Sequence, residues 1–176
     1  ATSEASSQPW FAPAGFNRGG VSNFKGARAK EILNKNDRDT LFLANINPIA
    51  RFPATGDTVI FGQKTLQQTA SALDRINVRR LMIYLKKKIG VIADTILFDQ
   101  NVRSTWDRFK AQAEPVLSGV QAEFGITEYK LVLDETTTTP DLQDRNIMYA
   151  KIYVKPARAI EFIAIDFVVT RSGVEF

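Results

Sequence analysis

The sequence predicts an α+β fold in which two long helices pack on a small antiparallel or mixed β-sheet, after an N-terminal helical and loop segment. Apolar residues recur with the 3.6-residue period of a helix in two long stretches between residues 73 and 124. A period of two follows in three segments between residues 128 and 170. Helices that precede a group of strands, instead of alternating with them, are typical of α+β domains.

Residues 9–20, PWFAPAGFNRGG, predict a loop of defined shape. Proline fixes φ, and glycine reaches φ values that other residues avoid. The large rings of Trp10, Phe11 and Phe16 are costly to leave in water, so they must pack on the domain or on a partner. Residues 1–8 are small and polar and do not begin with Met. We therefore expect residues 1–25 to lead in from a preceding region and residues 26–176 to form one domain.

Two short helices and a connector are expected next. Residues 26–34 predict the first helix, and Asp37 is a suitable cap for a second helix that carries Leu41, Phe42 and Ile46. The residue before a proline avoids the helical region, so this helix should end before Pro48. A short β-type run at residues 58–61 lies in the connector that follows.

The longest helix is predicted over residues 73–98, because six apolar side chains fall on one stripe: Val78, Leu81, Leu85, Ile89, Ile92 and Ile96. Gly90 costs this helix about 1 kcal/mol relative to Ala. A second long helix should begin near Ser104 as N-cap and end at Gly125, with a kink or a restart at Pro115. Its inner face is predicted to carry Trp106, Phe109, Ala113, Val116, Val120 and Phe124.

Three strands are predicted over residues 128–135, 147–155 and 160–170. The first two alternate apolar and polar residues, so each should be half-buried. The third is apolar on both faces and should be central in the sheet or covered by a partner.

Five further motifs, in order along the chain, accompany the aromatic loop: NPIARFP (47–53), FGQKTL (61–66), INVRRL (76–81), FDQNVRSTW (98–106) and IEFIAIDFVVTRSG (160–173). From about Trp10 to the C-terminus, this series resembles the conserved C-terminal domain of contractile bacteriophage tail sheath proteins. Gln63 and Lys64 stand where that family often has Ala and Arg.

The resemblance implies a structural subunit that polymerises helically around the tail tube and contracts to drive genome delivery. It implies neighbouring sheath subunits, the tail tube protein, the baseplate and the tail terminator as partners, and no membrane or cofactor. The expected location is the virion, after assembly in the host cytoplasm. A sheath of a related bacterial contractile injection system is the alternative within the same class.

Six basic residues decorate the longest predicted helix: Arg75, Arg79, Arg80, Lys86, Lys87 and Lys88. Between residues 70 and 98 the only acids are Asp74 and Asp94, so this surface should stay positively charged. A solvated basic face is one interpretation. The resemblance favours the other, in which the cluster binds the tail tube, because sheath C-terminal domains face inward and hold the tube largely by charge.

The C-terminal residues 160–176 are expected to serve as an inter-subunit arm, because sheath arms add strands to the sheets of neighbouring subunits. Alternatively, this tail only closes the sheet of its own domain. The residues expected to make the inter-subunit strand are Ile163, Ile165, Phe167, Val169, Val174 and Phe176.

Composition excludes much chemistry. The chain has no Cys and no His, which rules out thiol chemistry, His metal ligands and Ser-His-Asp triads, and we expect neither catalysis nor a metal. Its apolar runs are too short to span a bilayer. A pI near 9.4 and a ladder of Tyr149, Lys151, Tyr153 and Lys155 leave a basic nucleic-acid-binding module as the competing class, although an ordinary wet sheet face explains the ladder more simply.

Overall fold

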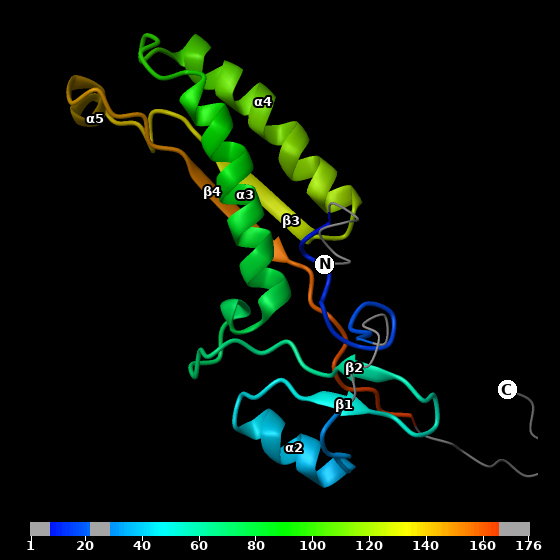
Figure 1. Ribbon diagram of the computed structural model, residues 1–176. Helices are drawn as coiled ribbons and strands as arrows, with labels where there is room; N and C mark the ends of the chain where they lie inside the picture. The colour runs from blue at the N-terminus through cyan, green and yellow to red at the C-terminus, as the bar shows by residue number, and fades with distance from the viewer. Residues whose placement is uncertain (1–7, 22–28, 166–176) are drawn as a thin grey trace, which may run out of the picture.

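The computed structural model describes residues 8–21 and 29–165, and it confirms the predicted α+β architecture (Figure 1). Helices α3 (Ile76–Asp94) and α4 (Arg103–Ala122) pack against the antiparallel pair β3 (Ile126–Val132) and β4 (Lys151–Pro156). A smaller lobe consists of α2 (Lys35–Leu43) and the antiparallel pair β1 (Ile49–Arg51) and β2 (Thr58–Ile60). The short helix α5 (Pro140–Asp144) lies between β3 and β4 in the chain.

The core lies between α3, α4 and the inner face of β3 and β4. Within it, the predicted apolar stripe of the longest helix is confirmed. Val78, Leu81 and Leu85 are buried, and Ile89 and Ile92 are half-buried against the two core clusters. Ile96 is also buried, but it lies in the turn that follows α3.

Both long helices differ from their predicted boundaries at the N-terminal end. Residues Ala72–Asp74 form a 3₁₀ turn capped by Ser71, whose Oγ accepts a hydrogen bond from the Leu73 amide at 3.1 Å. The turn is separate from α3 because the backbone of Arg75 between them is extended, with φ −114° and ψ 141°. Helix α4 begins after Val102, without a side-chain cap, so Ser104 is not its N-cap. The helix runs through Pro115 without the expected restart.

The predicted inner face of α4 is correct except at its end. Trp106, Phe109, Ala113 and Val120 are buried, but Phe124 is exposed because α4 ends at Ala122 and Phe124 adopts a left-handed φ of 61°. That turn carries its ring away from the helical stripe. Leu117, which the prediction omitted, is fully buried between α4 and the sheet, and Val116 packs on the same core.

The first predicted helix, over residues 26–34, is wrong where it can be compared. Residues 29–34 are not helical, and residues 26–28 lie outside the described residues. The capping box explains the difference: Asn34 Oδ1 accepts from the Asp37 amide at 2.9 Å, and Asp37 Oδ2 accepts from the Asn34 amide at 3.0 Å. Helix α2 therefore starts at Lys35 and ends at Leu43, before Ile46.

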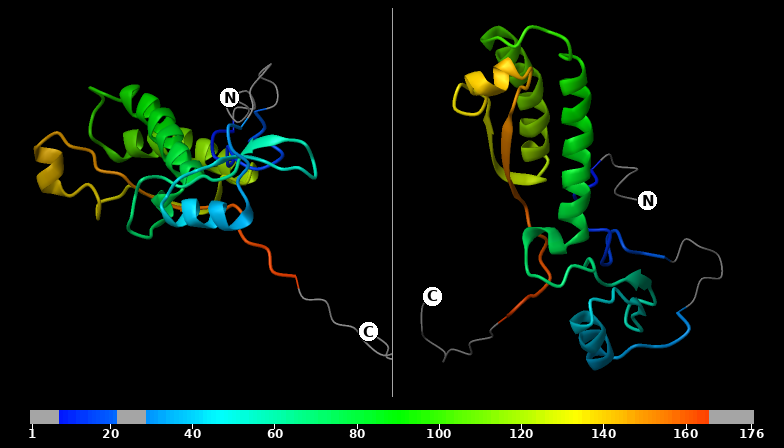
Figure 2. Two further views of the ribbon diagram at one scale, coloured as in Figure 1. Left: turned by 60° about the horizontal axis from the view of Figure 1, so that its bottom comes forward. Right: turned by 90° about the vertical axis from the view of Figure 1, so that its left-hand side faces the viewer.

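The sheet is smaller than predicted. In the described ranges β3 pairs only with β4, in the register Leu131↔Ile152, and their apolar side chains face the helices as expected. The third predicted strand is not formed over residues 160–165, which run extended and exposed, and residues 166–170 lie outside the described ranges. Figure 2 shows this segment leaving β4 and passing the start of α3. Its Phe162 ring contacts Phe42 of α2.

Candidate interaction surfaces

The basic residues on α3 do not share one environment. Arg79, Lys86 and Lys87 are exposed along the helix, and Lys88 is exposed with its ammonium 5.8 Å from the centre of the Tyr84 ring. Arg80 is half-buried. Arg79 and Lys86 project from nearly the same side of the helix with Lys87 beside them, and these three form a positively charged surface that can meet an acidic partner.

Arg75 lies apart from the other five basic residues because carboxylates surround it. Its Nε donates to Glu161 Oε1 at 2.7 Å and its Nη2 donates to Glu161 Oε2 at 2.9 Å. Nη1 lies 3.2 Å from Asp74 Oδ2. The hydrogen bond to Glu161 raises the pKa of the Arg75 guanidinium, with the charges of Glu161 and Asp74 acting in the same direction against burial. The expectation of an unneutralised basic surface therefore fails at this residue.

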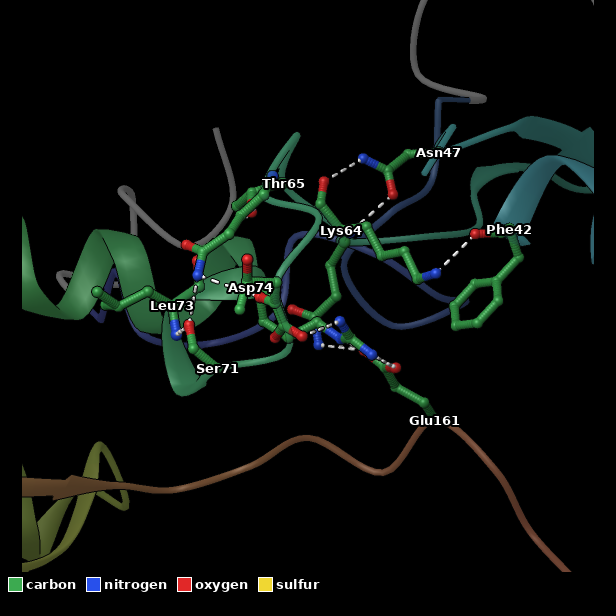
Figure 3. A network of polar contacts seen from close by, with 12 residues as sticks. Phe42, Asn47, Lys64, Thr65, Ser71, Leu73, Asp74 and Glu161 are labelled. Carbon is green, nitrogen blue, oxygen red and sulfur yellow. Dashed lines mark hydrogen bonds and ion pairs between the residues drawn. The ribbon is translucent and has the colours of Figure 1, made fainter. Parts of the chain in front are cut away.

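A polar joint connects the small lobe to the start of α3 (Figure 3). Asn47 donates from Nδ2 to the Lys64 carbonyl and accepts from the Lys64 amide, both at 2.8 Å. The Lys64 ammonium donates to the Phe42 carbonyl at 2.6 Å and lies 3.6 Å from the centre of the Phe42 ring. On the other side, the Ile76 amide donates to the Gln63 carbonyl at 2.8 Å. Residues 63–65 thus bridge α2 and α3.

Residues of the predicted inter-subunit strand are exposed wherever the structure describes them. Ile163 and Ile165 are 78% and 67% exposed. Phe167, Val169, Val174 and Phe176 lie outside the described residues. Large apolar side chains in this state are available to a partner surface.

The aromatic loop is divided between the two parts of the molecule. Trp10 is buried in the main core, where its Nε1 donates to the Glu123 carbonyl at 3.0 Å and its ring meets Tyr84 edge-on. Phe16 packs edge-on against Phe52 and Phe61 of the small lobe. Of the two expected alternatives, packing on the domain or on a partner, Trp10 adopts the first, whereas Phe16 contacts the small lobe but stays 52% exposed.

The Tyr and Lys ladder is interrupted. Strand β4 begins at Lys151, and the Tyr149 amide before it donates to Thr138 Oγ1 at 3.0 Å instead of joining the sheet. The Lys155 ammonium lies 3.4 Å from Glu128 of the neighbouring strand. Tyr153 stays exposed beside these charges. A mixed-charge, wet sheet face accounts for these contacts.

The described residues bear on two further kinds of functional feature, a metal site and a membrane-spanning helix. They contain no group of three or more acidic, His or Cys side chains placed to hold a metal ion. No helix in the described ranges is long and apolar enough to cross a membrane. An open cleft of about 600 Å³ lies between the start of α3 and residues 156–162. Its lining includes Gln63, which the motif comparison noted only as a departure from the family pattern, and Glu161, which no motif singled out. The available signal for Glu161 was a lone acid in an apolar run.

Comparisons with known proteins agree with the motif order. The family described as phage tail sheath C-terminal domain matches residues 68–170. The tail sheath protein of Vibrio phage KVP40 is 43% identical over 171 residues, which cover 97% of this chain and 25% of that protein. The tail sheath protein of Enterobacteria phage T4 is 39% identical over 170 residues, with the same coverage of each chain. The chain thus spans about a quarter of the length of these curated relatives.

Solved structures share the fold. A chain in the cryo-EM structure of the anti-feeding prophage baseplate superposes with a TM-score of 0.82 at 21% identity, over 97% of this chain and 48% of that one. A chain in the contracted sheath complex of the PVC extracellular contractile injection system gives 0.82 at 24% identity, over 94% and 47%. Taken with the family match and the two phage relatives, this likeness means that the chain belongs to the phage tail sheath family, within its C-terminal domain.

Proposed function

We propose that the chain is the C-terminal part of a structural subunit that polymerises around a phage tail tube and contracts to drive genome delivery. Relatives at 43% and 39% identity are tail sheath proteins, which supports this proposal. The proposed partners are neighbouring sheath subunits, the tail tube protein, the baseplate and the tail terminator. The proposed location is the tail of the virion, reached after assembly in the host cytoplasm. We propose no catalytic role.

One observation supports polymerisation most directly: within the described residues, β3 and β4 form a sheet of only two strands. Each strand therefore has one edge without a strand partner in those residues, while the inner faces of both strands pack on α3 and α4. Two-stranded sheets are marginal alone, and open edges recruit further strands through main-chain hydrogen bonds. A subunit with open edges and an exposed apolar tail can both accept and donate a strand.

Residues 160–176 are the proposed donor. The described part of this segment is extended and exposes Ile160, Phe162, Ile163 and Ile165, and it makes no strand pairing within the described ranges. Burial of these apolar side chains in a neighbouring subunit would stabilise the assembly by about 25 cal/mol for each Å² of apolar surface covered.

Deletion of residues 171–176 from the complete sheath subunit tests the proposal. We expect the subunit to stay folded but to form no tubes in negative-stain micrographs, because the donated strand loses its anchor. Hydrogen exchange supplies the second measurement: amides in residues 165–176 of the intact subunit should gain protection only on polymerisation. Amides in the centre of α4 serve as the control, since they should be protected in both states. Normal tube formation by the deletion variant, or equal protection of residues 165–176 in monomer and polymer, would contradict the proposal.

A further inference from the structure

We infer that Glu161 and Phe162 are positioning residues that pin the C-terminal segment between the start of α3 and α2, and so fix the direction in which the arm leaves the domain. This inference rests on the proposed function of residues 160–176 as an inter-subunit arm. Neither the family motifs nor the apolar pattern of the segment singles out these two residues for such a role.

Glu161 is the first anchor. Its side chain is only 21% exposed, whereas the apolar residues around it in the segment are mostly exposed. Both carboxylate oxygens accept from Arg75, in the parallel two-bond geometry that is the strongest and most directional arrangement of an Arg–carboxylate pair. Arg75 itself immediately precedes α3, so this anchor ties the segment to the start of that helix.

Gln63 adds a third contact to the same carboxylate. Its Nε2 donates to Glu161 Oε1 at 3.1 Å, and the residue is only 5% exposed. The other amide atom, Oε1, is buried without a hydrogen-bond partner in the described structure. Leaving the Gln63 Oε1 acceptor buried without a hydrogen bond costs folding free energy. The arrangement therefore favours one orientation of the Glu161 carboxylate at the expense of stability. The Glu161 carboxylate therefore accepts hydrogen bonds from two side chains, Gln63 and Arg75, that lie in separate parts of the chain.

Phe162 makes the second contact, on the opposite side, through one edge of its ring; the residue stays 77% exposed, so the rest of the ring remains available to a neighbouring subunit. Its ring meets Phe42 of α2 edge-on, with ring centres 5.8 Å apart and planes at 89°. Phe42 is itself held by the Lys64 ammonium through its carbonyl and its ring. Successive side chains of an extended segment point to opposite faces. Glu161 and Phe162 therefore bind the two parts of the molecule at once, which fixes the path of the backbone between them.

Such pinning lowers the entropy that must be lost when a neighbour receives the arm, because the root of the arm is already ordered. It also fixes the point on the domain from which the arm extends. Residues 162–176 span at most about 50 Å when fully extended, so a strand that these residues donate must pair within that distance of the pin. A receiving sheet edge must lie within that radius and in the direction that the pin sets.

Distance measurements between spin labels test the pin. The chain has no cysteine, so the exposed residues Ile83 and Ile163 can be changed to Cys and labelled as a unique pair. In the parent, double electron–electron resonance should give a narrow distance distribution. Glu161→Gln keeps the side-chain shape but removes the charge pair, and should broaden the distribution while lowering the equilibrium constant for docking about fivefold. Arg75→Gln should do the same, and the double variant should add little further.

Glu128→Gln is the matched control. Its carboxylate also pairs with a cation, Lys155, but both side chains are 73% exposed and the pair lies on the sheet surface. The distribution should not change in this variant. An unchanged distribution in Glu161→Gln, or equal broadening in Glu128→Gln, would overturn the inference.

Assembly of the complete subunit separates this inference from the proposed function. Glu161→Gln should slow tube formation about fivefold under conditions where the parent assembles fully. Broadening of the distribution with no change in assembly rate would refute the guiding role of the pin. If deletion of residues 171–176 leaves assembly intact, the arm proposal fails. If the deletion abolishes assembly but Glu161→Gln assembles at the parent rate, only the inference about the pin is refuted.

Discussion

Arg75 and Arg79 lie one helical turn apart, yet their surroundings assign them different roles. Arg75 is enclosed by Glu161 and Asp74, whereas Arg79 is exposed and donates a long hydrogen bond of 3.4 Å to the neutral side chain of Gln67. The two acids come from different parts of the chain, one adjacent and one 86 residues away. At the scale of single residues, the formal charge on a helix is therefore a poor measure of the charge it presents to a partner.

Two glycines provide a residue-scale test of packing, because an added methyl group would meet open space at one position and crowded atoms at the other. Gly90 lies inside α3, and a Cβ at this position would meet no atom within 4 Å. A Cβ at Gly125 would lie 2.5 Å from Val120 Cγ1 and 3.0 Å from the Trp10 ring. We expect Gly90→Ala to stabilise the domain by about 0.5–1 kcal/mol through helix propensity. Gly125→Ala should destabilise it by about 1–3 kcal/mol through overpacking.

Chemical denaturation of the two variants and the parent gives both free energies of unfolding. Each variant is the control for the other, since the added methyl group is the same. Stability changes of equal sign would show that the close approach of Trp10 to Gly125 does not constrain the fold.

At the scale of elements, the exposed cations of α3 form the proposed tube-binding surface. Changing Arg79, Lys86 and Lys87 to Glu reverses charges that lie off the buried stripe, so the fold should be retained. We expect binding to isolated tail tubes to fall at least tenfold and its salt dependence to weaken, because interactions between exposed charges are screened by salt. Co-sedimentation with tubes over a range of salt concentrations measures both quantities.

Arg51, Arg103 and Arg145 form a matched control, because they are exposed and lie on three different elements or turns. Their reversal to Glu changes the net charge equally and should affect tube binding little. Equal losses in the two triple variants would indicate that net charge, and not the α3 surface, governs binding.

Elements with long periodic patterns were predictable from the sequence, whereas their ends and one whole strand were not. The stripe of α3 and the alternation in β3 reflect burial against the rest of the fold, so Leu81 and Leu131 were placed correctly. The start of α2 depended on a local competition that the Asn34–Asp37 capping box decides. The pairing of Glu161 with Arg75 is set by tertiary packing across 86 residues, which no local pattern encodes.

The predicted third strand is absent from residues 160–165 for a similar reason. Both faces of this segment are apolar and would be stabilised by burial, but the described part of one chain leaves them exposed. Sequence pattern reports the final burial of a segment but not which chain provides it. In the proposed sheath, the covering surface belongs to a neighbouring subunit.

At the scale of the whole molecule, the described residues form two parts with unequal amounts of buried apolar surface. Both hydrophobic clusters are built from α3, α4, the β3–β4 pair and their turns, together with Trp10. In the small lobe of α2, β1 and β2, burial is limited to a few side chains such as Ala50 and Val59. The lobe is attached through the joint at Asn47, Lys64 and Gln63 and by the aromatic contacts of Phe16. Parts with little buried apolar surface open at lower free energy than the core.

We therefore expect the lobe to exchange its amide hydrogens before the helical core does. The Ile60 and Phe61 amides are bonded to carbonyls of Gly19 and Pro48 at 2.8 Å, and they should be less protected than amides in the centres of α3 and α4. Asn47→Ala removes both side-chain bonds to the Lys64 backbone, and should accelerate exchange in β1 and β2 about tenfold while leaving α4 unchanged. Native-state hydrogen exchange followed by mass spectrometry resolves the two regions. Equal acceleration in α4 would mean that the molecule opens as one cooperative unit, and that the joint is part of a single core.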